Sequence, residues 1–272
     1  MGSRIRAFVV TVVASILTAA ITLALAREVL SRQAAHARRQ IGKPLGEIAP
    51  DADRVWRRRQ DGACIDLLIV GDSIAAGLGA ERPKDVLGAR IAKSVGRALA
   101  RPVRLRTAAV VGSESADLVG QLDALPSDYS PDVALVIVGG NDVTHRIPVA
   151  TSVEYLVDAV TRLRDRGAAV IVGTCPDLSA LRPVPQPLRT LAGRMSHRLA
   201  AAQAEAAATA GARVVSLRHA VGPMFLSEPD EMFSLDRFHP SAVGYRRTAS
   251  AFVPVVIDAV REIDERRGKL LQ

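Results

Sequence analysis

The sequence predicts an α/β domain in which a parallel sheet is covered by helices on both faces. Five short apolar runs rich in Val, Ile and Leu alternate with longer amphipathic stretches, and this alternation is typical of βαβ units. An uncharged apolar run near the N-terminus stands apart from that pattern. We therefore expect an N-terminal signal-anchor or signal peptide over residues 1–26, a basic linker over 27–62 and one folded domain over 63–272.

The predicted strands are bounded by Gly, Pro or polar residues, as buried parallel strands usually are. They are Ile65–Val70, Val103–Val110, Val133–Val138, Ala168–Val172 and Ala212–Leu217. The predicted helices are about Lys84–Ala100, Ser115–Ala124, Ser152–Arg166, Pro187–Ala210 and Ser241–Arg266. Ser152 is a candidate N-cap, and Gly167 follows the last turn of the same helix.

The N-terminal run Ala7–Ala26 contains no charge and is long enough to cross a bilayer as a helix. A cleaved signal peptide is an alternative, because Ala24-Leu25-Ala26 resembles a cleavage site, and a buried core helix is another. The run is longer than the usual apolar region of a signal peptide, which favours an uncleaved anchor.

Two signals disagree on orientation. The arginines after the run, from Arg27 to Arg39, outnumber the charges before it and favour a cytoplasmic domain. A short basic N-terminus followed by an apolar run is how exported proteins begin. We expect the domain to be extracytoplasmic.

The net charge of +8 is concentrated in the tail. Residues 1–60 contain 11 Lys and Arg against 4 Asp and Glu, whereas residues 61–272 contain 25 against 24. A nucleic-acid-binding domain would carry a basic face on the fold itself, so the pattern suits an anionic membrane surface better. The sequence shows no zinc-ligand or phosphate-loop motif. Cys64 starts the first strand and Cys175 ends the fourth, so two free thiols are expected.

Polar groups follow three of the predicted strands, where functional residues of parallel sheets gather. The first strand runs into Gly71-Asp72-Ser73, the second into Val111-Gly112-Ser113, and the third into Gly139-Gly140-Asn141-Asp142. Each alone has a simpler explanation, since Ser73 can cap a helix and Gly or Asn can form a turn. Gly77 lies four residues after the serine, so this is not the G-x-S-x-G elbow.

A fourth group, Asp236-Arg237-Phe238-His239, precedes the last predicted helix. A carboxylate three residues before a histidine can fix the imidazole tautomer and leave the other nitrogen free as a base. Together the four groups supply a nucleophile in Ser73, a base in His239, an orienting acid in Asp236 and N–H donors for an oxyanion.

These four blocks, in this order, resemble the GDSL or SGNH hydrolase family over about residues 64–255. The resemblance implies a flavodoxin-like order of five parallel strands in a three-layer α/β/α fold, with no metal or organic cofactor. It also implies an oxyanion hole made by the Ser73 N–H, the Gly112 N–H and the Asn141 side chain. The first block reads GDSI where many members read GDSL, an aliphatic exchange that leaves the chemistry intact.

Other polar residues have simpler interpretations. His145 lies near Asn141 and can line the cleft, while His197 and His219 are interpreted as structural or surface groups. Asp72 and Asp142 are expected to hold their loops through backbone hydrogen bonds. Cys175 lacks the histidine and carboxylate that a nucleophile needs.

The expected function is cleavage of acyl esters through an acyl-enzyme on Ser73, with lipid or cell-envelope esters as substrates. Two segments, Arg182–Pro187 and Gly222–Phe233, are expected to be loops that shape an acyl pocket. Their bulky residues, Met224, Phe225, Met232 and Phe233, either line that pocket or pack beneath it. One alternative is an O-acyltransferase of the same fold. Another is a catalytically silent, membrane-tethered binding module. The presence of all five residues, Ser73, Gly112, Asn141, Asp236 and His239, argues against it.

Overall fold

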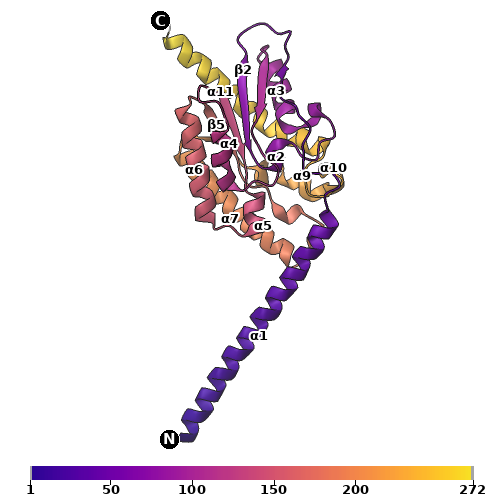
Figure 1. Cartoon of the computed structure of the whole chain (residues 1–272), viewed down its shortest axis with the longest axis vertical. Helices are drawn as coiled ribbons and strands as arrows, with labels where there is room; N and C mark the ends of the chain where they lie inside the picture. The colour runs from indigo at the N-terminus through magenta and orange to yellow at the C-terminus, as the bar shows by residue number, and fades with distance from the viewer. Residues whose placement is uncertain (1, 271–272) are drawn as a thin grey trace.

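A computed structural model describes residues 2–270 as a three-layer domain from which one long helix projects (Figure 1). The central sheet has the strand order β1-β3-β2-β4-β5-β6. Its strands are β1 (Val55–Trp56), β2 (Ile65–Gly71), β3 (Val103–Thr107), β4 (Val133–Ile137), β5 (Ala169–Gly173) and β6 (Arg213–Val215). The five expected strands are all present and parallel, which confirms the predicted fold class.

The expected strand number needs one correction, because β1 adds a sixth strand at the edge. It pairs antiparallel with β3, Val55 opposite Arg104 and Trp56 opposite Val103. This strand lies within the range expected to be a basic linker. Two residues are too few to show the alternation by which a strand is recognised in sequence, so only the pairing partner reveals it.

Each central strand buries both of its faces. In β2, Leu67 and Ile69 pack into one core while Leu68 and Val70 pack into the other. Helices α3 and α11 cover the first face, and α4, α6 and α7 cover the second. The α-helices of the domain are α2 (Ser73–Ala76), α3 (Leu87–Ala98), α4 (Leu118–Asp123), α5 (Gly140–His145), α6 (Val149–Asp165), α7 (Leu188–Thr209), α8 (Leu217–Ala220), α9 (Gly222–Ser227), α10 (Pro229–Met232) and α11 (Ala242–Leu270).

Two local expectations were wrong. Ser152 is not a cap, because α6 begins at Val149 directly after Pro148, and the Ser152 side chain is fully buried inside the helix. The segment expected to be a loop over Gly222–Phe233 instead forms the short helices α9 and α10. Pro223 and Pro229 sit in the first turn of these helices, where proline is tolerated because its missing N–H has no intrahelical partner.

The strand order determines where on the sheet a ligand is expected to bind. The chain passes from β2 to β3 on one side and then crosses to β4 on the other side of β2. Ligands of open α/β sheets bind at such a switch point, beyond the carboxyl ends of the strands. Here that point lies between β2, which runs into Ser73, and β4, which runs into Asn141.

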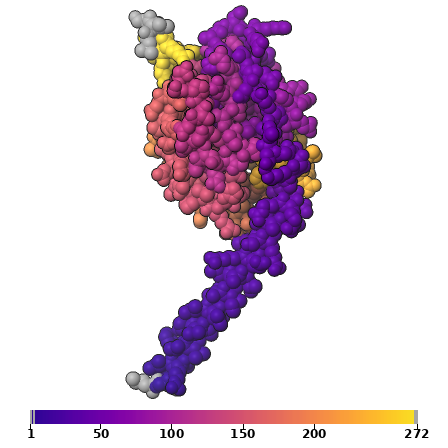
Figure 2. Space-filling view, in the orientation of Figure 1, coloured from indigo at the N-terminus to yellow at the C-terminus, as the bar shows by residue number. Residues whose placement is uncertain are grey.

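Helix α1 (Gly2–Ile41) is continuous and projects from the domain as a rod (Figure 2). The domain buries none of its apolar part, so the alternative that this segment is a core helix is wrong. The far end does contact the domain: Ala37 is buried, and Gln33 bonds the backbone of Gln186 and Leu188. By length and composition the apolar part suits either a membrane anchor or a signal sequence.

Candidate active site

Ser73 is the first residue of α2, directly beyond the carboxyl end of β2. The turn before it requires glycine, because a Cβ on Gly71 (φ +136°) would lie 1.8 Å from the carbonyl oxygen of Ile137 in β4. Asp72 then caps α2, its Oδ1 accepting from the N–H of Ile74 at 2.9 Å. These local features turn the chain sharply and leave Ser73 at the edge of the sheet.

Tertiary folding brings His239 to Ser73 from 166 residues away. The Ser73 Oγ lies 2.9 Å from His239 Nε2, and His239 Nδ1 lies 2.6 Å from Asp236 Oδ2. The serine, histidine and aspartate thus form one hydrogen-bonded chain. With Nδ1–H donating to the carboxylate, Nε2 is the free nitrogen that can accept the serine proton.

The Asp236 carboxylate is held by its own turn. Its Oδ1 accepts from the Ser234 hydroxyl at 2.8 Å and from the backbone N–H groups of Phe238 and His239 at 2.9 Å each. Burial alone raises the pKa of Asp236, but the hydrogen bonds from His239 and Phe238 outweigh burial, and this pKa lies below its ordinary value. Asp236 therefore stays ionised opposite the imidazole.

Contacts behind His239, made by Gly79 and Tyr245, constrain its distance from Ser73. A Cβ on Gly79 (φ +106°) would lie 2.4 Å from the Pro240 carbonyl oxygen and 3.0 Å from the His239 Cβ. The backbone at Gly79 therefore packs directly behind the histidine. The fully buried Tyr245 donates its hydroxyl to the Leu78 carbonyl at 2.6 Å, which ties α11 to the same loop.

The expected oxyanion donors are only partly assembled around Ser73. Asn141 lies in the first turn of α5 and lines the same pocket as Ser73. Its Nδ2 donates to the Ser113 carbonyl at 2.9 Å, and an amide NH₂ has a second N–H to offer. Gly112 (φ +89°) lies instead in a groove lined by residues 106–125, and it is not among the residues that line the Ser73 pocket.

Two side chains fasten the Gly112 loop to its neighbours. The buried Asp142 carboxylate accepts from the Ser115 N–H at 3.1 and 3.2 Å. Gln121 bonds both the N–H and the carbonyl of Gly71 at 2.8 Å, and also the Ser113 hydroxyl at 3.0 Å. Asp142 thus holds its loop through a backbone hydrogen bond as expected, and the loops that follow β2, β3 and β4 form one bonded unit.

His145 also belongs to this unit. Its Nδ1 lies 2.5 Å from Glu114 Oε1, which joins the end of α5 to the Gly112 loop. The sequence did not reveal this pair, because the carboxylate lies 31 residues before the histidine and on another loop. The one signal for the pair is that both residues follow strands of the same sheet, whose carboxyl ends meet at one edge.

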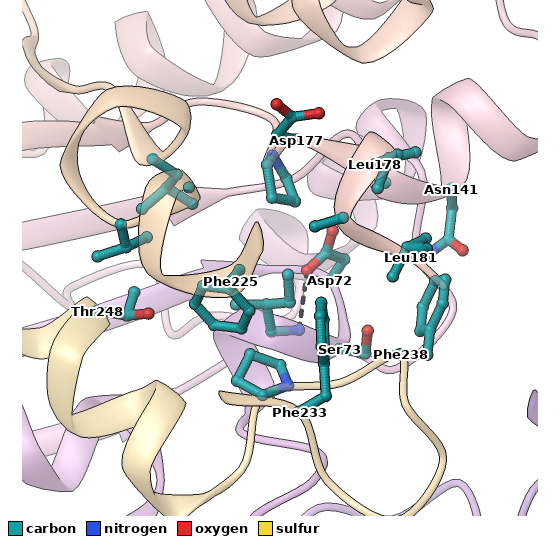
Figure 3. A pocket seen from close by; sticks show the side chains of 18 residues that line it. Asp72, Ser73, Asn141, Asp177, Leu178, Leu181, Phe225, Phe233, Phe238 and Thr248 are labelled. Atoms are coloured by element: carbon teal, nitrogen blue, oxygen red, sulfur yellow. Dashed lines mark hydrogen bonds between the residues drawn. The ribbon is translucent and has the colours of Figure 1, made fainter. Parts of the chain in front are cut away.

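An apolar pocket begins at Ser73 (Figure 3). Phe225 and Phe233 form one wall, with ring centroids 4.9 Å apart in an edge-to-face arrangement. Leu178 and Leu181, labelled in Figure 3, form the opposite side. Such a cavity has a polar reacting end and an apolar body, which suits an alkyl or acyl chain.

Of the two segments predicted to shape the pocket, only one lines it. Phe225 and Phe233 line the cavity, whereas Met232 is fully buried in the core. The other wall comes from Pro176–Leu181 and not from Arg182–Pro187. That wall follows the carboxyl end of β5, the edge of a parallel sheet at which ligands bind.

The remaining titratable groups have local partners. Burial raises the pKa of Asp72 to about 6, against the hydrogen bond from Ile74 that lowers it. Burial also raises the pKa of the Cys175 thiol, which makes it a poor nucleophile, and both Cys64 and Cys175 are free. His197 lies 2.8 Å from Asp177 Oδ2. Within residues 2–270, no three His, Cys, Asp or Glu side chains are grouped to hold a metal ion.

His219 is partnered by the Ser216 hydroxyl at 3.0 Å and is exposed. It therefore has the surface position expected for it, as does the partly buried His197 within its pair with Asp177.

Comparison with known proteins places this chain in a family. Residues 69–247 match the GDSL-like lipase/acylhydrolase family. A GDSL-like esterase of Mycobacterium tuberculosis is 40% identical over 247 residues, which cover 87% of this chain and 78% of the relative. The crystal structure of TesA shares the fold with a TM-score of 0.58 at 23% identity, over 71% of this chain and 99% of TesA.

An acetylxylan esterase from Geobacillus stearothermophilus, as a catalytic mutant, also shares the fold. Its TM-score is 0.57 at 18% identity, over 72% of this chain and 95% of the esterase. The family match and the esterase relative go further than the fold. This chain belongs to the GDSL-like lipase/acylhydrolase family and is an ester-hydrolysing enzyme of that family.

Proposed function

We propose that the chain cleaves carboxylic esters with Ser73 as nucleophile, His239 as general base and Asp236 as the orienting carboxylate. The observation that carries this proposal is the hydrogen-bonded chain from Ser73 Oγ through His239 to Asp236, placed at the mouth of an apolar pocket. The 2.9 Å contact puts the serine proton within direct reach of Nε2.

In the first half of the reaction the Ser73 Oγ bonds to the ester carbonyl carbon while its proton passes to His239 Nε2. The carbonyl oxygen gains the negative charge and is held by the Ser73 N–H and the free Asn141 N–H. The third donor that the family resemblance implies, the Gly112 N–H, lies outside this pocket in the structure. Collapse breaks the bond to the alkoxy oxygen, which takes the proton from His239 and leaves as an alcohol. An acyl group remains on Ser73.

In the second half a water molecule repeats the attack. It gives one proton to His239 Nε2 and its oxygen to the acyl carbon. The bond to Ser73 Oγ then breaks, and the proton returns to the serine. The product is a carboxylic acid, and the enzyme is regenerated without a metal or redox cofactor in any step.

We infer that the acyl part of the substrate lies in the apolar pocket, between the Phe225–Phe233 wall and the Leu178–Leu181 wall. Each buried methylene contributes about 0.8 kcal/mol to binding, so an apolar pocket favours medium or long acyl chains. Lipid or cell-envelope esters are the proposed substrates. The apolar part of α1 supports a membrane-anchored enzyme. The short basic N-terminus before it, with Arg4 and Arg6, is the feature that favours an extracytoplasmic catalytic domain.

The test uses the full chain in detergent with p-nitrophenyl butyrate, comparing the wild type with Ser73→Ala. The exposed Ser127→Ala is the matched control, since Ser127 lies outside the site. Loss of the nucleophile should lower kcat by several orders of magnitude and abolish labelling by a fluorophosphonate. Turnover by Ser73→Ala at the wild-type rate would contradict the proposed role of Ser73.

A further inference from the structure

We propose that a basic face on α7 and the segment before it docks on the anionic headgroups of the bilayer that holds α1, so that the pocket takes its acyl chain from that bilayer. This basic face consists of Arg194 and Arg198, which lie four residues apart on one side of α7, and of Arg182 in the segment before the helix. The part about acyl delivery rests on the proposed function, whereas the docking itself does not.

The first observation is the charge of this surface. Between Asp177 and Glu205 the chain contains four arginines and no acidic residue. Arg182, Arg194 and Arg198 are exposed, and Arg189 is partly exposed. The domain beyond residue 60 is nearly neutral as a whole, with 25 Lys and Arg, these four included, against 24 Asp and Glu. Clusters of this kind beside a membrane-spanning helix attract anionic lipids, by about 1 kcal/mol for each cation.

The second observation is the distance from the anchor. The apolar run ends at Ala26, and Gln33 already bonds Gln186 and Leu188 at the start of the basic face. Seven helical residues extend about 10 Å, whereas the headgroup layer on each side of the hydrocarbon is roughly 5–8 Å thick. The basic face therefore begins within reach of the headgroups when the run spans the bilayer.

The third observation links this face to the pocket. Ala37 of α1 packs in one cluster with Leu178 and Leu181, which also line the pocket at Ser73. Arg182 follows Leu181 directly in the chain. In Figure 1, α5 and the start of α7 lie at the lower end of the domain, the end from which α1 departs. The anchor, the basic face and the pocket wall thus belong to one end of the molecule.

The occupant we assign is an anionic bilayer, because charge and anchor geometry both point to it. Leu191 is 37% exposed on α7 between Arg189 and Arg194, an apolar side chain placed among cations. This combination is typical of surfaces that lie at a lipid interface.

The test places the full chain in nanodiscs of phosphatidylcholine alone or with 30% phosphatidylglycerol. A fluorophore on Thr190→Cys reports contact with lipids that carry a quencher on the headgroup, and one on Ser94→Cys is the control site on α3. Cys64 is replaced by Ser in both, while Cys175 is fully buried and stays unlabelled.

The perturbation is Arg182→Gln/Arg194→Gln/Arg198→Gln. The matched control removes the same charge at the opposite edge of the sheet, with Arg58→Gln/Arg59→Gln/Arg97→Gln. We expect strong quenching at position 190 in anionic discs only, lost in the basic-face triple and kept in the control triple. About a fivefold weaker docking equilibrium is expected for each arginine removed.

Activity supplies a second readout with 4-methylumbelliferyl oleate in the disc and 4-methylumbelliferyl acetate in water. The ratio of oleate to acetate turnover should fall at least about tenfold in the basic-face triple and stay at the wild-type value in the control triple. Quenching at position 190 no stronger than at position 94, or unchanged in the basic-face triple, would overturn the proposal. Quenching should persist in Ser73→Ala, so docking and the proposed chemistry can fail separately.

Discussion

Replacing Gly79 by Ala should disable the site without touching any reacting group. The added Cβ would lie 2.4 Å from the Pro240 carbonyl oxygen, and real Cβ atoms essentially never approach closer than 3.0 Å. The His239–Pro240 backbone must therefore retreat by at least about 0.6 Å, because repulsion rises steeply at shorter separations. The hydrogen bond between His239 Nε2 and Ser73 Oγ is 2.9 Å long. A retreat of this size would stretch it beyond the normal range of a hydrogen bond.

A misplacement of about 1 Å can cost about 100-fold in rate, so a retreat of about 0.6 Å should lower kcat by about 10–100-fold. KM should change little because the pocket walls stay in place. The positive φ of +106° adds strain of roughly 1–2 kcal/mol for alanine. The assay measures kcat and KM on p-nitrophenyl butyrate, normalised to the folded fraction from thermal unfolding. Gly120→Ala in α4 is the control: nothing lies within 4 Å of its Cβ, and a gain of about 0.5–1 kcal/mol is expected. Folded Gly79→Ala with wild-type kcat would refute this account of the loop.

Three further changes test the remaining parts of the site. Asp236→Asn keeps an acceptor for the turn but offers an N–H to His239 Nδ1, so kcat should fall about 10³–10⁴-fold with the fold retained by circular dichroism; a loss below tenfold would contradict the orienting role. Asp72→Asn should raise the free energy of unfolding at pH 7 by about 2–3 kcal/mol in urea melts. The pKa of Asp72 is about 6 in the folded protein against an ordinary 3.8, so between these values the native state binds a proton that the unfolded state does not. The stability gained by Asp72→Asn should therefore vanish below about pH 4. An equal gain at about pH 7 and below about pH 4 would disprove this account of Asp72. Phe225→Ala opens the pocket wall and should raise the decanoyl-to-butyryl ratio of kcat/KM about tenfold, while the exposed neighbour Leu226→Ala leaves the ratio unchanged; equal ratios would place the acyl chain elsewhere.

Much of the fold could be read from sequence because its elements have local signatures. The β2 run Ile65–Val70 is apolar throughout because both faces of the strand are buried, and that pattern is visible without a structure. Helix α7 was predicted to within a residue or two because Pro187 precedes it and Gly211 follows it. The edge strand β1 and the short helices α9 and α10 have too few residues for any periodicity, and packing against the domain determines them.

The candidate site divides in the same way. Ser73, Asn141, Asp236 and His239 could be predicted because each lies in a short polar block at a strand end or before the last helix. The Glu114–His145 pair and the packing of Gly79 behind His239 join segments far apart in the chain. No local pattern encodes such contacts, since either partner alone is an ordinary loop residue.

By itself, the sequence determined that this protein has a parallel α/β domain, a serine and histidine suited to ester cleavage, and an apolar N-terminal run long enough to span a membrane. These properties follow from residue type and periodicity within single segments. Only the tertiary structure decided that Pro176–Leu181 forms the pocket wall and that α1 docks beside it through Gln33 and Ala37. The physical reason is that packing and hydrogen bonding between distant segments depend on the whole fold, so the relation of the site to the anchor exists only in three dimensions.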